Sequence, residues 1–413
     1  MVQIRPFAAL RPQKGKAREI AALPYDVYSR KEAAEKVRGD GLTFLRIDRP
    51  ETMFPTDTDM YAPQVYKKAD EMLRQMEEKG DLMQDAAPCY YLYELTRNNQ
   101  SQTGLAVCYS VEEYRLGVVR KHENTRKEKE QDRICHIDAC SAQTGPVFLT
   151  YRPNQEIKQI ILQEKVKEPV YDFVSEDGIG HRLWVVDTPS VIGKLTALFS
   201  DVERLYIADG HHRAAAAAAV AGLRSKKNPK YTGKEESAGV LSVLFPEDEL
   251  KILPYHRVLK DLGGKTPEEL LAVLSEVFTI NRAPFSPYEP EKKGEMGLYL
   301  EGSWYQLQVK PEHCKEDPIG ILDVAYLQRE VLTPIFGIED PRTDHRIDFV
   351  GGIRGVGELE KRCRKDCKAA FSMYPTSMEE LLAAADAGLL MPPKSTWFEP
   401  KLRSGLLIHK IER

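Results

Sequence analysis

The stretch RLYIADGHHRAAAAAAVAGL, residues 204–223, limits the fold of this chain more than any other part of the sequence. Residues 204–208 form a short apolar run that predicts a buried strand, and the alanines from 214 onward are the strongest helix formers. Gly222 is expected to end that helix. Between strand and helix stand four polar residues and a glycine, which are Asp209, Gly210, His211, His212 and Arg213. The sequence therefore predicts a polar strand-to-helix corner whose last residues lie in the first helical turn.

Such a corner suits an anion. The amide groups of a first helical turn have no intrahelical acceptor, and the helix dipole is positive at that end. Arg213 adds a planar fork of donors that matches a phosphate or a carboxylate. An ordinary polar turn accounts for the same residues, so the motif by itself leaves both interpretations open.

The bulk composition excludes several classes of protein. The 59 basic and 63 acidic residues are interspersed and give a formal net charge of −4, so no overall attraction to nucleic acid or to an anionic membrane is expected. There is no run of 18 apolar residues, and the N-terminus does not resemble a signal peptide. The seven cysteines are an odd, scattered set, which favours reduced thiols and a cytoplasmic location.

Hydrophobic periodicity and capping signals predict the main elements. They are helices over 30–38 (with Ser29 and Glu32 as a capping box), 58–80 and 126–140 (with Thr125 and Glu128), strands over 88–96 and 104–115, and a late helix from Ser377 and Glu380 to Gly388. Strands and helices alternate irregularly and several hairpin signals occur between them. This pattern predicts an α+β fold with a mixed sheet rather than a doubly wound parallel one.

Two further polar clusters lie near predicted helix ends. His122 and Glu123 precede the charged helix, and Lys394, Ser395 and Thr396 follow Gly388. A carboxylate that orients a hydroxyl, donors that hold phosphates and a positive charge are what phosphoryl transfer needs. Each cluster also fits a solvated surface, and the sequence does not show whether the three meet in space.

Several familiar sites are absent from the sequence. HENTR at 122–126 begins like a zinc-protease motif, but Arg126 stands where the second histidine is required. There is no G-x-x-x-x-G-K-[ST], no G-x-G-x-x-G and no protein-kinase signature, so the common nucleotide-binding loops are excluded.

Six blocks carry a family resemblance. They are PYDV (24–27), HENTR (122–126), QTGPVFL (143–149), DGHHR (209–213), RIDFVGG (346–352) and MPPKSTWFEPKL (391–402). Together they resemble a long bacterial family that is labelled partition-protein-like. The resemblance implies a ParB/sulfiredoxin-like mixed-sheet core with additional α/β segments. We expect an N-terminal α/β segment over 1–85, the nucleotide-binding core over 86–260, and a C-terminal α+β region over 261–413 that contributes the Lys-Ser-Thr stretch.

Through that fold the chain is similar to the free-serine kinases, which convert L-serine to O-phospho-L-serine with ATP or ADP and Mg²⁺. The similarity implies that Glu123 is the general base, assisted by His122. It implies that Gly210, His211, His212 and Arg213 hold nucleotide phosphates, with Asp209 as a catalytic residue and a ligand of Mg²⁺. Lys394, Ser395 and Thr396 would close over the phosphate or the amino-acid carboxylate. The blocks PYDV and RIDFVGG have no counterpart in those kinases, and this chain is much longer.

Two other functions use the same residues differently. A non-catalytic nucleotide-binding regulator of the partition-protein type would need the anion corner but no acceptor site. A DNA-binding partition protein would need a helix-turn-helix and a basic face, which the mixed charge disfavours. The expected partners are a nucleotide and a small hydroxyl compound, with no membrane and no nucleic acid; a homodimer is left open.

Overall fold

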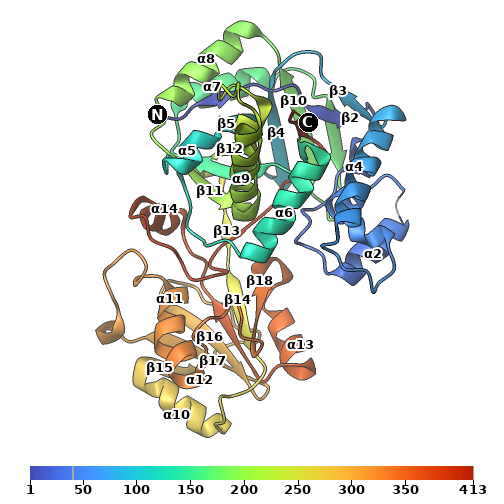
Figure 1. Cartoon of the computed structure of the whole chain (residues 1–413). Helices are drawn as coiled ribbons and strands as arrows, with labels where there is room; N and C mark the ends of the chain where they lie inside the picture. The colour runs from blue at the N-terminus through green and yellow to red at the C-terminus, as the bar shows by residue number, and fades with distance from the viewer. Residues whose placement is uncertain (40, 413) are drawn as a thin grey trace. The chain divides into compact units, whose positions relative to one another are not determined.

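A computed structural model describes residues 1–39 and 41–412, and the chain divides into two compact units. Unit 1 comprises residues 1–120, 125–250 and 400–413. Unit 2 comprises residues 121–124 and 251–399. Each unit is described by itself below, with the element labels of Figure 1.

Unit 1 is built on a mixed β-sheet. In the described residues its strands follow the order β6-β11-β8-β12-β5-β4-β10-β9, and β1 also pairs with β5. Their bounds are β1 (Ile4–Arg5), β4 (Tyr90–Arg97), β5 (Gln100–Ser110), β6 (Val119–Arg120), β8 (Val147–Tyr151), β9 (Tyr171–Val174), β10 (Gly180–Val186), β11 (Leu205–Asp209) and β12 (Gly239–Pro246). β12 pairs parallel with β8 and antiparallel with β5, which makes the sheet mixed, as the sequence predicts.

Helices cover this sheet and the N-terminal part of unit 1. Their bounds are α1 (Ala17–Ile20), α2 (Arg30–Gly39), α3 (Leu45–Asp48), η1 (Pro50–Met53), α4 (Pro63–Glu78), α5 (Val111–Arg115), α6 (Lys127–Cys140), α7 (Gln155–Glu164), α8 (Pro189–Ser200), α9 (His211–Lys227), η2 (Glu236–Ala238) and η3 (Glu247–Glu249). Helices α6 and α9 pack side by side, and α9 packs on β8 and β12 (Figure 1). The alanine block is small enough to let α9 approach the sheet closely, and it is buried in the main core with Leu149 and Leu244.

Short strand pairs tie the rest of unit 1 together. They are β2 (Leu10–Pro12) with β3 (Leu82–Gln84), and β7 (Ala142–Gln143) with β21 (His409–Lys410). Ile408 is fully buried in a second core formed by the N-terminal helices, and Ile411 is buried in the main core. These apolar contacts explain why residues 400–413 belong to unit 1.

Unit 2 contains an antiparallel sheet of order β15-β17-β16-β19-β14-β18. Its elements are β13 (Ile252–Leu253), β14 (Tyr255–Leu259), α10 (Pro267–Val277), β15 (Phe278–Arg282), β16 (Glu295–Leu300), β17 (Ser303–Val309), η4 (Pro311–His313), α11 (Asp323–Leu327), the π-helix η5 (Gln328–Leu332), α12 (Thr333–Phe336), β18 (Ile347–Gly351), η6 (Gly352–Arg354), α13 (Gly357–Lys365), β19 (Ala369–Met373), α14 (Met378–Asp386) and β20 (Trp397–Phe398). Helix α13 packs on this sheet and contributes Leu359 to its core.

The predicted elements exist, with different ends. The helix expected over 58–80 begins only at Pro63, and the strand expected over 104–115 gives way to α5 at Val111. Helix α9 continues through Gly222 to Lys227, so the predicted end of that helix is wrong. A glycine in a helix interior costs only about 1 kcal/mol, which the packing of α9 offsets.

The division into units differs from the three predicted segments. Unit 1 runs through both 1–85 and most of 86–260, and it also takes the last 14 residues, 400–413. The three functional segments 1–85, 86–260 and 261–413 therefore remain a prediction from the sequence.

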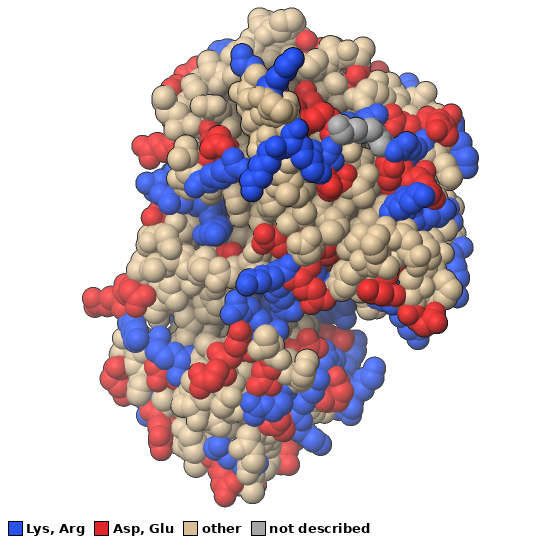
Figure 2. Space-filling view, viewed as in Figure 1, with Lys and Arg blue, Asp and Glu red and all other residues tan. Residues whose placement is uncertain are grey.

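The described part of the chain has no helix long and apolar enough to cross a membrane. Figure 2 shows acidic and basic side chains interspersed over the face in view, in keeping with the small net charge of −4.

Candidate functional site

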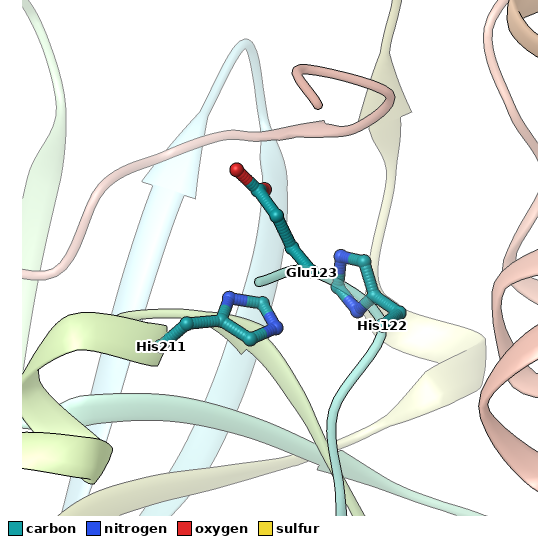
Figure 3. A group of neighbouring side chains, drawn as sticks. All are labelled: His122, Glu123 and His211. Atoms are coloured by element: carbon teal, nitrogen blue, oxygen red, sulfur yellow. The ribbon is translucent and has the colours of Figure 1, made fainter. Parts of the chain in front are cut away.

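The strand-to-helix corner in unit 1 has the predicted form. Strand β11 ends at Asp209 after a bulge in its pairing with β8. Helix α9 begins at His211, whose side chain is drawn in Figure 3. Gly210 between them has a φ of +97°, a left-handed conformation that favours glycine. His211, His212 and Arg213 therefore form the first helical turn.

Arg213 folds back over Gly210. A Cβ atom at position 210 would lie 3.0 Å from Nε and from Nη2 of Arg213, so a side chain there would press on the guanidinium. Nη2 donates to Oδ2 of Asp209 at 3.0 Å, and Nη1 donates to the carbonyl oxygen of Pro146. The predicted phosphate-binding fork is thus used to hold the corner together, and Arg213 has only an 11 % exposed side chain.

Asp209 is held by two cations. Besides Arg213, Nζ of Lys401 lies 3.4 Å from Oδ1 of Asp209. Burial alone would raise the pKa of Asp209, but the charges of Lys401 and Arg213 outweigh burial and hold that pKa well below its usual range. Asp209 is therefore a carboxylate at all ordinary pH values.

These contacts do not fit Mg²⁺ on Asp209. Hard cations bind carboxylate oxygens, but both oxygens of Asp209 already lie near positive groups that would repel a divalent ion. We therefore derive no step through a metal ion held by Asp209, and the assignment of Asp209 as a Mg²⁺ ligand stays a sequence prediction that the geometry disfavours.

His212 contacts the start of α6 in the same unit. The amide of Arg126 donates to Nε2 of His212 at 3.0 Å. A ring nitrogen that accepts is unprotonated, so this contact selects the neutral imidazole with its proton on Nδ1. Nδ1–H of His212 is then a hydrogen-bond donor in the first turn of α9.

The block QTGPVFL supports this corner. A Cβ at Gly145 would lie 2.9 Å from Oγ of Ser404, so a larger residue would crowd that hydroxyl, and it would be in ordinary contact with Nη1 of Arg213 at 3.7 Å. Gln143 is buried and bridges to β12: its Nε2 donates to the carbonyl oxygen of Gly239 at 2.7 Å, and its Oε1 accepts from the amide of Leu241 at 2.8 Å.

In unit 2, the segment 121–124 lies against the segment 391–396. The amide of Met391 donates to the carbonyl oxygen of His122 at 2.8 Å, and Nε2 of His122 lies 3.3 Å from Oγ1 of Thr396. His122 is buried, while Glu123 beside it is partly exposed. Figure 3 draws both side chains. The structure thus joins two predicted clusters whose residues His122 and Thr396 are 274 positions apart in the chain.

Glu123 also has a basic neighbour in unit 2. The pKa of Arg342 is raised chiefly by its hydrogen bonds to Asp340, with a smaller contribution from the charge of Glu123. Arg342 was not among the predicted site residues, because it stands in a loop with no motif signal.

The three residues of the Lys-Ser-Thr stretch differ in role. Lys394 has a φ of +59°, unusual for a residue with a side chain, and its Nζ lies 5.4 Å from the ring centre of Tyr255. Ser395 is buried, and its hydroxyl donates to the carbonyl oxygen of Pro392 at 2.6 Å. Lys394 and Thr396 are therefore the candidates for contact with a ligand, whereas Ser395 stabilises the turn.

The block RIDFVGG packs against the residues that flank the Lys-Ser-Thr turn. Its strand β18 pairs with β14, and a Cβ at Gly351 would lie 2.7 Å from Cε3 of Trp397. Arg257 on β14 is buried, which lowers the pKa of Arg257 to about 10, and its Nη2 donates to the carbonyl oxygen of Pro393 at 3.4 Å. Sequence reasoning missed Arg257, since a lone arginine within an apolar strand gives no pattern.

Residues 4–325 match the family described as "Protein of unknown function (DUF1015)". The chain belongs to the DUF1015 family. The match runs from β1 into α11, and the partition-protein label of the sequence resemblance is not part of it. No protein with a curated description matches the DUF1015 chain.

Three solved structures illustrate what the fold is similar to. A mutant free serine kinase in complex with ADP is 12 % identical with a TM-score of 0.39, covering 75 % of this chain and 92 % of that one. A conserved hypothetical protein from Pyrococcus furiosus is 12 % identical with a TM-score of 0.37, covering 73 % and 94 %. SbnI with a C-terminal truncation, from Staphylococcus aureus, is 11 % identical with a TM-score of 0.37, covering 74 % and 87 %. These likenesses are too weak to carry an activity or a site over to the DUF1015 chain.

Proposed function

We propose that this DUF1015 protein is a small-molecule kinase that transfers a phosphoryl group from ATP or ADP to the hydroxyl of free L-serine, giving O-phospho-L-serine. The proposal includes the ParB/sulfiredoxin-like assignment of the core, in which the mixed sheet presents the β11–α9 corner. The observation that carries it is the contact of His122 with Thr396, because it gathers a carboxylate, an imidazole and a Lys-Ser-Thr turn in one unit.

The nucleotide phosphates are assigned to the first turn of α9. Its amides and the positive end of a 17-residue helix favour an anion, and His211 and His212 lie in that turn. Arg213 fixes this corner through Asp209 and Pro146 rather than by gripping the phosphate. A divalent cation would enter bound to the nucleotide, and no residue of this chain is assigned to it.

Glu123 is assigned as the general base. It would accept the proton of the serine hydroxyl as that oxygen attacks the terminal phosphorus, while the bond from phosphorus to the bridging oxygen breaks and ADP or AMP leaves. Lys394 would stabilise the negative charge on the transferred group.

The short chain segment between Glu123 and Arg126 limits how far the proposed base can lie from Arg126. Only Asn124 and Thr125 separate Glu123 from Arg126, whose amide donates to His212. Three residues of extended chain span at most about 11 Å, so the Cα atoms of Glu123 and Arg126 cannot be farther apart than that.

The test is an incubation of the full chain with L-serine, Mg²⁺ and either ATP or ADP, with O-phosphoserine measured by mass spectrometry. The proposal expects product with one of these donors, and a decrease in kcat of about 100-fold or more in Glu123→Gln. Glu276→Gln, on the exposed side of α10, is the matched control and should retain full activity. Nucleotide binding without any phosphorylated product would instead favour the regulatory alternative.

A further inference from the structure

The N-terminal part of unit 1 contains a pocket of about 280 Å³. It is lined by the turn of the PYDV block, by α2, η1 and α4, and by the first half of α6. The turn is closed by a hydrogen bond from the amide of Val27 to the carbonyl oxygen of Pro24 at 3.1 Å, and it includes Asp26. The volume is at the lower end of ligand pockets, which suits a small metabolite.

The inner wall of this pocket carries charges that are already matched. Nε of Arg49 lies 2.5 Å from Oε1 of Glu51, and Nη2 of Arg133 lies 2.8 Å from Oδ2 of Asp132. Tyr66 also donates to Asp132 at 3.0 Å. All four ionic side chains are less than a tenth exposed, so their pairing offsets the cost of burying them. They hold the wall and leave no net charge for a ligand.

Three other charged residues line the pocket without an ionic partner among the described residues: Asp26, Arg30 and Lys129. Arg30 donates to backbone carbonyl oxygens at 2.9 Å and 3.3 Å, and Nζ of Lys129 lies 3.5 Å from the hydroxyl of Tyr61. The pocket therefore presents one acidic and two basic groups that a ligand can neutralise.

We infer that this pocket binds a free α-amino acid, with its ammonium group on Asp26 and its carboxylate on Arg30 and Lys129. A molecule with one cationic and one anionic group matches these three charges. A simple anion could pair with Arg30 and Lys129, but Asp26 would repel it. The ring of Tyr25 and the side chains of Met60 and Val65 supply apolar wall for the rest of the ligand. The identification of the ligand as L-serine, and of the pocket as the acceptor site, rests on the proposed function.

The position of the pocket within unit 1 fits that role. Cζ of Arg133 lies 4.0 Å from the ring centre of Tyr25, and both residues also line a smaller cavity whose wall includes Arg213. One Tyr-Arg stack thus separates the pocket from the β11–α9 corner. This gives the PYDV block a function that the kinase resemblance does not supply.

The test is calorimetric binding to the full chain without nucleotide. L-serine is compared with ethanolamine, which lacks the carboxylate, and with 3-hydroxypropionate, which lacks the ammonium. We expect both analogues to bind about tenfold or more weakly than L-serine. Asp26→Asn should weaken the binding of L-serine by a similar factor without weakening that of 3-hydroxypropionate, because the variant removes a charge that repels this anion. Lys129→Gln should weaken the binding of L-serine without weakening that of the cation ethanolamine.

The matched controls are Asp57→Asn and Lys127→Gln, which alter exposed residues outside the pocket and should bind like the parent chain. If L-serine does not bind, the other proteinogenic amino acids are titrated in the same way. The inference is overturned if no amino acid binds, or if Asp26→Asn and Lys129→Gln bind as the parent does.

Its failure is distinguishable from failure of the kinase proposal. Amino-acid binding that depends on Asp26, with no phosphorylated product from any donor, supports the pocket and contradicts the kinase. O-phosphoserine formation with an unchanged KM for serine in Asp26→Asn contradicts the pocket and leaves the kinase standing.

Discussion

Arg213 donates a hydrogen bond to Asp209, four residues earlier, across the left-handed residue Gly210. The ion pair closes the strand-to-helix corner from inside, and its geometry depends on the missing side chain at position 210. Within the DGHHR block, Arg213 and Asp209 thus act as a scaffold that fixes the direction of the first turn of α9.

The first prediction concerns that glycine. Gly210→Ala puts a Cβ 3.0 Å from the guanidinium and forces alanine into a left-handed φ, so unfolding free energy should fall by about 1–3 kcal/mol. Urea denaturation followed by circular dichroism measures this change. Gly193→Ala is the control, because Gly193 lies within α8 with no atom within 4 Å of its Cβ position, and that variant should be unchanged or more stable. Equal stability of the two variants would contradict the strain.

The second prediction is a pH dependence. Lys401 and Arg213 lower the pKa of Asp209 in the folded chain below its unfolded value, so the unfolded state binds its proton at higher pH. The carboxylate therefore stabilises the fold fully above about pH 4, and that contribution is lost as the pH falls through the folded pKa. Asp209→Asn should be less stable than the parent at pH 7, and the gap should narrow between pH 5 and pH 2. A gap that stays constant over this range would show that Asp209 acts other than as a charge.

Local signals in the sequence predict the local structure well. The capping boxes of Ser29 with Glu32 and of Ser377 with Glu380 are confirmed, since each needs only residues three apart. The Thr125–Glu128 box is wrong: α6 begins at Lys127, and the hydroxyl of Thr125 donates to Glu130 at 2.7 Å instead. A competing partner two residues farther along cannot be recognised from spacing alone.

Contacts between distant segments were beyond sequence reasoning. Lys401 reaches Asp209 from 192 positions away, and Arg257 supports Pro393 from 136 positions away. Neither cation differs in the sequence from an ordinary surface residue, because its role is set by burial and by the partner that the fold supplies. The mixed α+β fold was predictable from periodicity, whereas the support of the candidate site was not.

The third prediction tests how the Lys-Ser-Thr turn is seated. Gly351→Ala would place a Cβ 2.7 Å from the ring of Trp397, which must then move away from β18. We expect a shifted tryptophan emission and at least tenfold less phosphorylated product, because a small misplacement near reacting groups costs rate. Gly357→Ala has open space around its Cβ and should keep the parent's emission and activity. An unchanged emission in Gly351→Ala would contradict the close packing on Trp397.

The last prediction separates stability from activity at Lys394. Its φ of +59° costs a residue with a side chain about 1 kcal/mol, so Lys394→Gly should be as stable as the parent or up to about 1 kcal/mol more stable. The same change removes the positive charge assigned to the transferred phosphoryl group, and product formation should fall by about 100-fold. Glu301→Gly is the matched control, since Glu301 has a φ of +46° in the exposed turn between β16 and β17 and should gain stability without losing activity. Activity that survives in Lys394→Gly would remove Lys394 from the proposed mechanism, because the reaction would then not need the charge of this side chain.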